Sequence, residues 1–269
     1  MHLVVCVKQV PDTTEVRIDP VTNTLVREGV PSILNPYDAH AAEAAVELKE
    51  RYGGKVTIVC MGPPQAFEVI KQCISYGADR GILLSDRAFA GSDTWATSYT
   101  IGLALRRLRD EDGIDMVLCG KQAIDGDTAQ VGPGLARRLD VPQITYAVGV
   151  EDVDLETRTA RVLRRLEKGV EVVQTPLPCL LTCVEEMNEL RYSTLPNMIR
   201  AARYVPEVWG KDDLKGDPDL LGLKGSPTMV NRIFPPPARQ PGEIVGTDDD
   251  PGRAAESLAD RLEALVEHA

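Results

Sequence analysis

The sequence is poor in the residues that build metal sites and disulfides. It has only three histidines, and none of its six cysteines forms a C-x-x-C pair. Zinc sites need closely spaced histidines and cysteines, so we expect no metal site. The scarcity of histidine also removes the commonest general base, and no nucleophile with an adjacent base stands out. We therefore assign no catalytic side chain.

Positive charge and long apolar runs are also scarce. The 269 residues contain 30 Lys and Arg against 41 Asp and Glu, a formal net charge of −11. Such a balance disfavours general attraction to phosphate backbones, so we do not expect a nucleic-acid partner. No apolar run approaches the ~20 residues of a membrane span, and no signal peptide precedes the first strand-like run. We expect a cytoplasmic protein that does not itself span a membrane.

Aromatic residues are few as well, at 4% of a chain that is 43% hydrophobic. The apolar content is mostly Ala, Val, Leu and Ile, which suits helices packed closely on a sheet. Strand-like runs at 2–7, 55–60, 80–84 and 116–119 alternate with helical patterns at 36–51, 65–76, 93–109 and 130–139. This order predicts an α/β fold with a mostly parallel sheet flanked by helices. The alternating stretch 12–27 indicates a small hairpin or excursion.

The pattern changes after residue 150. Strand-like runs at 160–165, 170–174 and 179–183 are joined by short turns, which predicts a small antiparallel section. Residues 205–246 are rich in Pro and Gly, and we expect an extended arm on another subunit, or disorder. Residues 251–268 read as an amphipathic helix. We therefore expect two parts, a nucleotide-binding α/β domain at 1–204 and an arm with a helix at 205–269.

The turn after the fourth strand is the most informative loop. It contains Gly120, Gly126 and Gly132, which would let the backbone approach a ligand, and it opens a helix. A helix start offers free N–H groups and partial positive charge, which suits a phosphate. Thr128 and Gln130 could add side-chain donors. The loop has neither Walker nor G-x-G-x-x-G spacing, so an anion-binding loop and a plain strand-to-helix connection both remain open.

Six motifs occur in the order and spacing of one known family. They are VCVKQVPD at 5–12, NPYD at 35–38, MGP at 61–63, GADRG at 77–81, GKQAID at 120–125 and LRYSTLPN at 190–197. Together they resemble the beta subunit of electron-transfer flavoproteins over about residues 3–204. The resemblance implies a Rossmann-like domain that binds an adenine nucleotide and pairs with a larger alpha subunit. In the ordinary branch this subunit holds AMP, and in the electron-bifurcating branch it holds a second FAD.

The resemblance also implies which residues touch the cofactor. Asn35 is in addition a good N-cap for the helix at 36–51. The expected contacts lie at strand ends and in the glycine-containing loop, several of them through backbone: Cys6, Asn35, Asp38, Met61, Gly120, Ala123, Gly126, Asp127, Thr128, Ala129, Gln130 and Val131.

The loop after the third strand favours the bifurcating branch. Its sequence SDRAFAGSDTWATS at 85–98 resembles the version that holds the second flavin. Asp93, Thr94 and Thr97 lie at the start of the following helix. The hydroxyls of Thr94 and Thr97 can both face one ligand there. Without the resemblance, these residues would read as ordinary helix-cap residues. We therefore prefer FAD over AMP.

A second site is expected at 190–204. In the family this segment docks the dehydrogenase, with the leucine that matches Leu195 as an apolar anchor. The other interpretation is a surface helix with solvated arginines. The residues assigned to docking are Arg191, Leu195, Pro196, Met198 and Arg200.

The resemblance implies an electron carrier in which the cofactor supplies the chemistry. NADH is the expected electron donor. Electrons would leave through the alpha-subunit flavin to a dehydrogenase or quinone oxidoreductase, and also to ferredoxin or flavodoxin. Whether the chain counts as part of an NADH-oxidising enzyme or as a carrier stays open. The alternatives are an AMP-holding subunit of a carrier for acyl-CoA dehydrogenases and, from another class, a stand-alone nucleotide-binding sensor.

Overall fold

The computed structural model describes residues 1–12, 31–231, 242 and 250–266. The predicted excursion at 12–27 lies almost wholly outside these residues. The chain divides into two units, Met1–Asn231 and Arg232–Ala269. The first unit holds the sheets and their flanking helices. The described part of the second unit contains helix α7 (Pro251–Val266), on which Leu258, Leu262, Leu265 and Val266 are all exposed.

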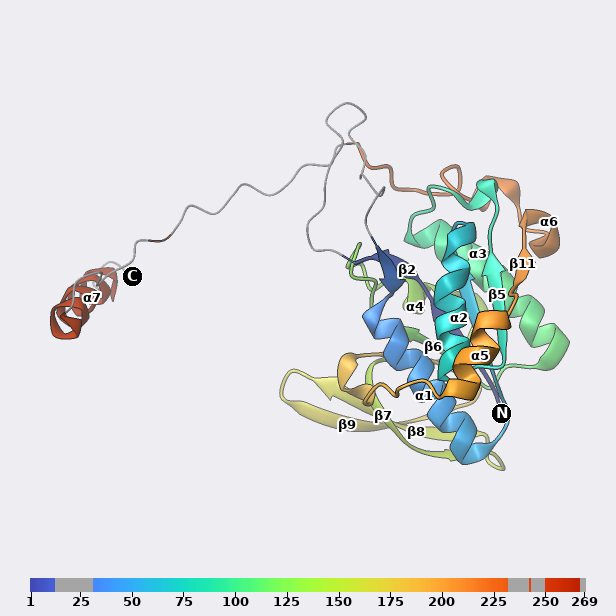
Figure 1. The fold of residues 1–269 in the computed structure, drawn as a ribbon, viewed down its shortest axis with the longest axis horizontal. Coiled ribbons are helices and arrows are strands. Elements are labelled where there is room, and N and C mark those ends of the chain that lie inside the picture. The colour runs from blue at the N-terminus through green and yellow to red at the C-terminus, as the bar shows by residue number, and fades with distance from the viewer. Residues whose placement is uncertain (13–30, 232–241, 243–249, 267–269) are drawn as a thin grey trace. The chain divides into compact units, whose positions relative to one another are not determined.

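The first unit is organised around a nine-stranded sheet of order β11-β5-β4-β1-β6-β10-β7-β8-β9 (Figure 1). The pairs from β11 to the start of β7 are parallel, whereas β8 pairs antiparallel with β7 and β9 pairs antiparallel with β8. A separate antiparallel pair joins β2 (Gln9–Pro11) and β3 (Ser32–Leu34). The strands of the large sheet are β1 His2–Val7, β4 Lys55–Met61, β5 Arg80–Leu84, β6 Met116–Gly120, β7 Gln143–Asp154, β8 Thr159–Leu166, β9 Gly169–Pro176, β10 Cys179–Cys183 and β11 Glu207–Trp209. The predicted α/β fold is confirmed.

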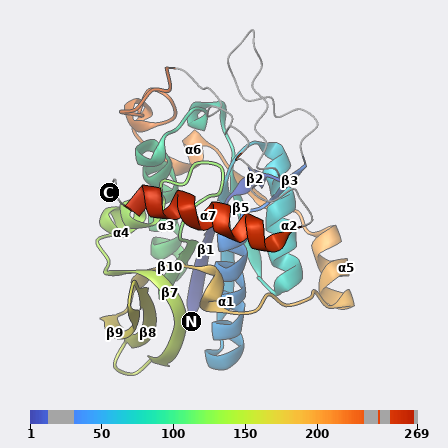
Figure 2. The ribbon, with the colours of Figure 1, turned by 90° about the vertical axis from the view of Figure 1, so that its left-hand side faces the viewer.

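Helices cover both faces of the sheet, as Figure 2 shows. Helices α1 (Pro36–Tyr52) and α2 (Phe67–Tyr76) share one hydrophobic core, whereas α3 (Thr94–Asp112) and α4 (Val131–Leu139) share the other. The unbroken apolar run of β1 is buried along its whole length because it lies between the two cores. Shorter helical elements complete the unit: η1 Pro64–Ala66, η2 Arg87–Phe89, η3 Glu185–Met187, α5 Leu195–Arg203, α6 Lys211–Leu214 and η4 Pro218–Leu220.

The expected boundary at residue 204 is wrong. Strand β11 joins the edge of the sheet beside β5, and its Trp209 is only 4% exposed. The Trp209 ring lies 4.0 Å from the guanidinium carbon of Arg107 and 5.8 Å from that of Arg80. These contacts attach β11 to the first unit. That unit continues through the Pro- and Gly-rich residues to Asn231. Packing of the second unit on an alpha subunit stays a prediction.

Candidate functional site

The carboxyl ends of β1 and β6 lie side by side and carry the two innermost loops. The strands pair in parallel, with Cys6 opposite Cys119. Lys8 follows β1, and its Nζ lies 2.6 and 2.8 Å from the two carboxylate oxygens of Asp125 in the loop after β6. Ligands of open α/β sheets bind at this edge, so the loop after β6 is in the expected position.

Asn35 holds this loop with its side chain. Its amide nitrogen donates to the carbonyl of Gln122 at 2.8 Å, and its amide oxygen accepts from the N–H of Ile124 at 3.2 Å. The predicted side-chain cap on α1 is therefore wrong, because both polar atoms of Asn35 face the loop instead. The side chain is fully buried, so these bonds replace its lost hydration.

Asp38 ties the ends of the two strands together. One carboxylate oxygen accepts from the backbone N–H of Lys8 at 2.8 Å, and the other accepts from that of Gly120 at 2.9 Å. Burial raises the pKa of Asp38 to about 7, against the lowering effect of hydrogen bonds that include these two. Asp38 thus acts on the loop backbone, and any effect on a ligand would pass through that loop.

The loop between β6 and α4 has an unusual backbone. Asp127 and Ala129 have positive φ angles of 50° and 54°, a conformation that residues other than glycine adopt at an energetic cost. Gln122 fixes the turn by donating to Asp127 at 2.7 Å. A left-handed residue beside a right-handed one, such as Ala129 beside Gln130, can turn neighbouring N–H groups toward an anion.

The start of α4 is open for such an anion. In the described part of the chain, the amides of Thr128, Ala129 and Gln130 donate no hydrogen bond. Gln130 does not cap the helix with its side chain. Unpaired N–H groups at a helix start, with the positive end of the helix dipole, fit a phosphate or diphosphate.

The three glycines of the loop have different roles. A Cβ on Gly120 would lie 2.4 Å from a carboxylate oxygen of Asp38, and one on Gly132 would lie 2.6 Å from Thr182 Cγ2. Gly120 and Gly132 therefore make room for neighbouring protein atoms, and a close approach of their backbone to a ligand stays a prediction. Gly126 has nothing within 4 Å of its Cβ position, so the loop is open there.

The remaining predicted contacts come from the same edge of the sheet. Cys6 is buried near the end of β1, and burial raises the pKa of its thiol, which makes it a packing group. Met61 is the last residue of β4 and is half-buried, as are Ala123 and Val131 at the two ends of the loop. These four residues are buried or half-buried beside the proposed ligand position, and their contact with a cofactor stays a prediction.

Asp93 begins α3, and its predicted capping role is confirmed. One carboxylate oxygen accepts from the amides of Trp95 at 2.9 Å and Ala96 at 3.0 Å. Thr94 and Thr97 are half-buried in the first turn of the same helix. The helix follows the loop after β5, the strand two places from β1 in the sheet.

The segment predicted to dock a partner forms α5 and the loop before it. Arg191 pairs with Glu43 at 2.8 Å and Glu50 at 2.7 Å, and Arg200 donates to two backbone carbonyls of the α2 region. These arginines therefore fasten the segment to α1 and α2. Its exposed apolar side chains remain available for contact: Tyr192, Leu195, Met198 and Ile199. Pro196 lies in the first turn of α5. Sequence reasoning missed Tyr192, which is 98% exposed.

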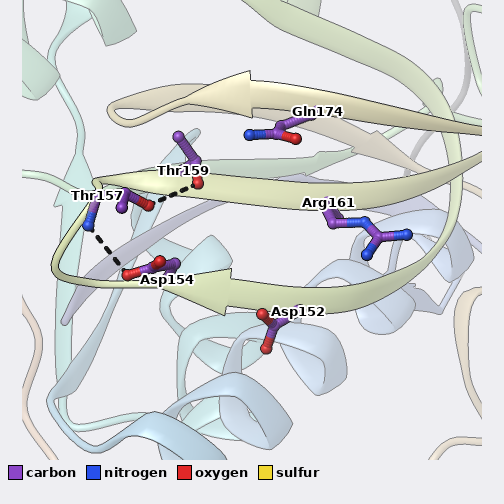
Figure 3. Close-up of a pocket in the computed structure, with 6 residues that line it drawn as sticks. All are labelled: Asp152, Asp154, Thr157, Thr159, Arg161 and Gln174. Carbon is purple, nitrogen blue, oxygen red and sulfur yellow. Dashed lines mark hydrogen bonds between the residues drawn. The ribbon is translucent and has the colours of Figure 1, made fainter.

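A hollow elsewhere on the first unit does not belong to this site. Figure 3 shows its lining on β7 to β9: Asp152, Asp154, Thr157, Thr159, Arg161 and Gln174. Arg158, in the β7–β8 turn, pairs with Asp115 just before β6. The hollow is therefore near the amino end of β6, whereas the loops described above follow its carboxyl end. Its polar lining lacks an apolar wall for a flat ring.

Comparison with known proteins agrees with this architecture. The profile of the electron transfer flavoprotein domain matches residues 22–213. Protein FixA of Azotobacter vinelandii is 48% identical, over 97% of this chain and 94% of that protein. The caffeyl-CoA reductase-Etf complex subunit CarD of Acetobacterium woodii is 49% identical, over 97% and 98%. The electron transfer flavoprotein subunit beta of Clostridium acetobutylicum is 47% identical, over 91% and 92%.

The sheet with its loop-bearing carboxyl edge and the match over most of the chain define the class: the chain belongs to the electron transfer flavoprotein family. Within that family it is a beta-type subunit, and beta subunits pair with an alpha subunit. Among the described residues, no helix combines the length and apolar character needed to cross a membrane.

Proposed function

We propose that this subunit holds FAD at the carboxyl edge of its sheet and, in a heterodimer with an alpha subunit, takes part in flavin-based electron bifurcation from NADH. One observation carries the proposal. The unpaired amides of Thr128, Ala129 and Gln130 stand at the start of α4, beside open space at Gly126. This arrangement suits the diphosphate of an adenine dinucleotide.

The residues present fit such a cofactor. The amides at the start of α4 would hold phosphate oxygens, and the side chains of Thr128 and Gln130 would add donors. Thr94 and Thr97 would bond the flavin ring edge or the second phosphate. When bound, the flavin supplies the redox chemistry, accepting a pair of electrons and releasing them one at a time.

The chain's own contribution is positioning. Asn35 and Asp38 hold the loop by hydrogen bonds to its backbone and to that of Gly120, and the Lys8–Asp125 ion pair ties it to the end of β1. A loop that is ordered before binding loses less entropy when the cofactor arrives. No side chain is assigned a proton-transfer step.

Two observations favour FAD over AMP. Thr94 and Thr97 offer a second set of donors that an AMP held by the loop after β6 would not need. One relative is, by its name, a subunit of a caffeyl-CoA reductase-Etf complex, an assembly of the proposed kind. The alternative is an AMP-holding subunit of a carrier that serves acyl-CoA dehydrogenases.

The proposed partners follow from the exposed apolar surfaces. Leu195 and Met198 on α5 would dock a dehydrogenase or quinone oxidoreductase, with ferredoxin or flavodoxin as the low-potential acceptor. The apolar side chains of α7 would pack on the alpha subunit. We place this heterodimer in the cytoplasm.

The test is to count cofactors. The chain is co-expressed with its alpha subunit, the heterodimer is denatured, and the released FAD and AMP are quantified by chromatography. Two FAD per heterodimer support the proposal, whereas one FAD with one AMP rejects bifurcation in favour of the carrier. A stable monomer that retains nucleotide without any alpha subunit would favour a sensor instead.

A further inference from the structure

We propose that residues 222–228 form a clasp that positions the loop before α3, so that Thr228 and Ser226 set how tightly the flavin is held. This proposal adds a positioning role to the function proposed above and rests on that function. The sequence predicts for this segment an arm on another subunit, or disorder, whereas in the structure the segment lies within the first unit.

The strongest contact of the clasp is made to Asp93. The second carboxylate oxygen of Asp93 accepts from the hydroxyl of Thr228 at 2.7 Å and from the amide of Thr228 at 3.1 Å. Its first oxygen caps α3. The carboxylate therefore accepts four hydrogen bonds, two from each segment, and joins the clasp to the helix that carries Thr94 and Thr97.

Ser226 makes a second connection. Its hydroxyl oxygen accepts from the amide of Asp93 at 2.8 Å and lies 2.8 Å from the carbonyl oxygen of Gly222, to which it donates. The amide of Leu223 donates to the carbonyl of Ala90 at 3.0 Å. The clasp thus contacts both ends of the stretch 90–93 by hydrogen bonds to backbone or to Asp93.

Close packing completes the contact. A Cβ on Gly222, which has a φ of 58°, would lie 2.2 Å from the carbonyl oxygen of Ala88. A Cβ on Gly91 would lie 3.2 Å from Cβ of Leu223. Trp95 and residues 224–227 of the clasp border one hollow, so the clasp also lies beside the first turn of α3.

These contacts have a chemical consequence. The first turn of α3 presents its positive end to the proposed cofactor, and a carboxylate free to move there would repel the phosphates. With four donors, Asp93 is held in its capping position. Burial opposes ionisation, but the hydrogen bonds from Ala96, Thr228 and Trp95 outweigh it and lower the pKa of Asp93. Thr94 and Thr97 are then presented in one fixed arrangement.

The test compares variants in the intact heterodimer. Thr228→Val removes the hydroxyl and keeps the shape, whereas Thr228→Ser keeps the hydroxyl. Thr157→Val is the matched control, because its hydroxyl lies 3.0 Å from that of Thr159 in the β7–β8 turn (Figure 3). Two quantities are measured: amide hydrogen exchange of residues 88–97 and the rate at which the FAD of this subunit is lost during dialysis.

Thr228→Val is expected to speed exchange at 88–97 and FAD loss by roughly ten- to a hundred-fold, the size of one hydrogen bond to a charged group. Thr228→Ser and Thr157→Val should match the wild type. Unchanged exchange in Thr228→Val would overturn the clasp, and faster exchange with unchanged FAD loss would overturn its role in positioning. If the wild type holds AMP, the proposed function fails. The same comparison with AMP loss then decides the clasp.

Discussion

The carboxylate of Asp38 lies directly against Gly120. One oxygen accepts the N–H of Gly120 at 2.9 Å, and a Cβ at position 120 would lie 2.4 Å from that same oxygen. Helix α1 and strand β6 can therefore meet only because residue 120 is glycine. The contact lies at the last residue of β6, where the loop that follows begins.

Gly120→Ala should destabilise the protein by about 3 kcal/mol, since the new methyl group meets Asp38 and the backbone of Tyr37. Gly126→Ala is the matched control in the same loop, where the added methyl group meets nothing within 4 Å. Urea unfolding of both variants measures the difference. Equal stability of the two would contradict the packing role of Gly120.

Asp38 should make stability depend on pH. Its pKa of about 7 in the folded protein lies above the value of about 3.9 expected in the unfolded chain, so folding takes up a proton between these values. Its contribution to stability is complete below about pH 4 and is lost as the pH rises through about 7. Asp38→Asn should remove this part of the slope, up to roughly 1.4 kcal/mol per pH unit.

Urea unfolding of wild type and Asp38→Asn at several pH values between 5 and 8 measures that slope. At pH 5 the variant should also be the less stable of the two proteins, because an amide cannot accept from both backbone N–H groups in the geometry of the carboxylate. Parallel pH curves for the two proteins would show that Asp38 does not titrate in this range.

Arg191 should matter for stability before it matters for docking. Its partner Glu43 has a side chain only 3% exposed, so Arg191→Met leaves a buried carboxylate without its cation. The cost should be about 3 kcal/mol. Arg203→Met, an exposed arginine at the end of α5, should change stability by less than about 0.5 kcal/mol. Thermal or urea unfolding of the two variants compares them directly, and similar values would remove the structural role.

Leu195 should matter for docking and not for stability. Its side chain is 69% exposed at the start of α5, so Leu195→Ala should leave the unfolding temperature unchanged. If it is an apolar anchor, kcat/KM for electron transfer to the dehydrogenase should fall about ten-fold. Leu166→Ala, an exposed leucine on β8, is the control. Equal kcat/KM for the two variants would move the docking surface away from α5.

The parallel sheet could be predicted because its signals are local. Unbroken apolar runs predict β1, β4, β5 and β6, and the helices between them follow from spacing. The cap at Asp93 was predictable for the same reason, since the capping residue and the amides it accepts from are three residues apart or fewer.

The missed features depend on residues distant in sequence. Strand β11 has three residues and is held by Trp209 against Arg80 and Arg107, which come from β5 and α3. Asn35 reads as a cap locally, yet its partners lie near residue 123. A glycine in the sequence does not show whether the space left by its missing side chain is filled by a ligand or by a neighbouring helix.

The most direct test of the central claim is an experimental structure of the heterodimer purified with its own cofactors. We expect an adenine-containing cofactor whose phosphate oxygens accept hydrogen bonds from the amides of Thr128, Ala129 and Gln130, with a flavin ring near Thr94 and Thr97. A structure in which those amides meet only water, with both cofactors bound elsewhere, would contradict it.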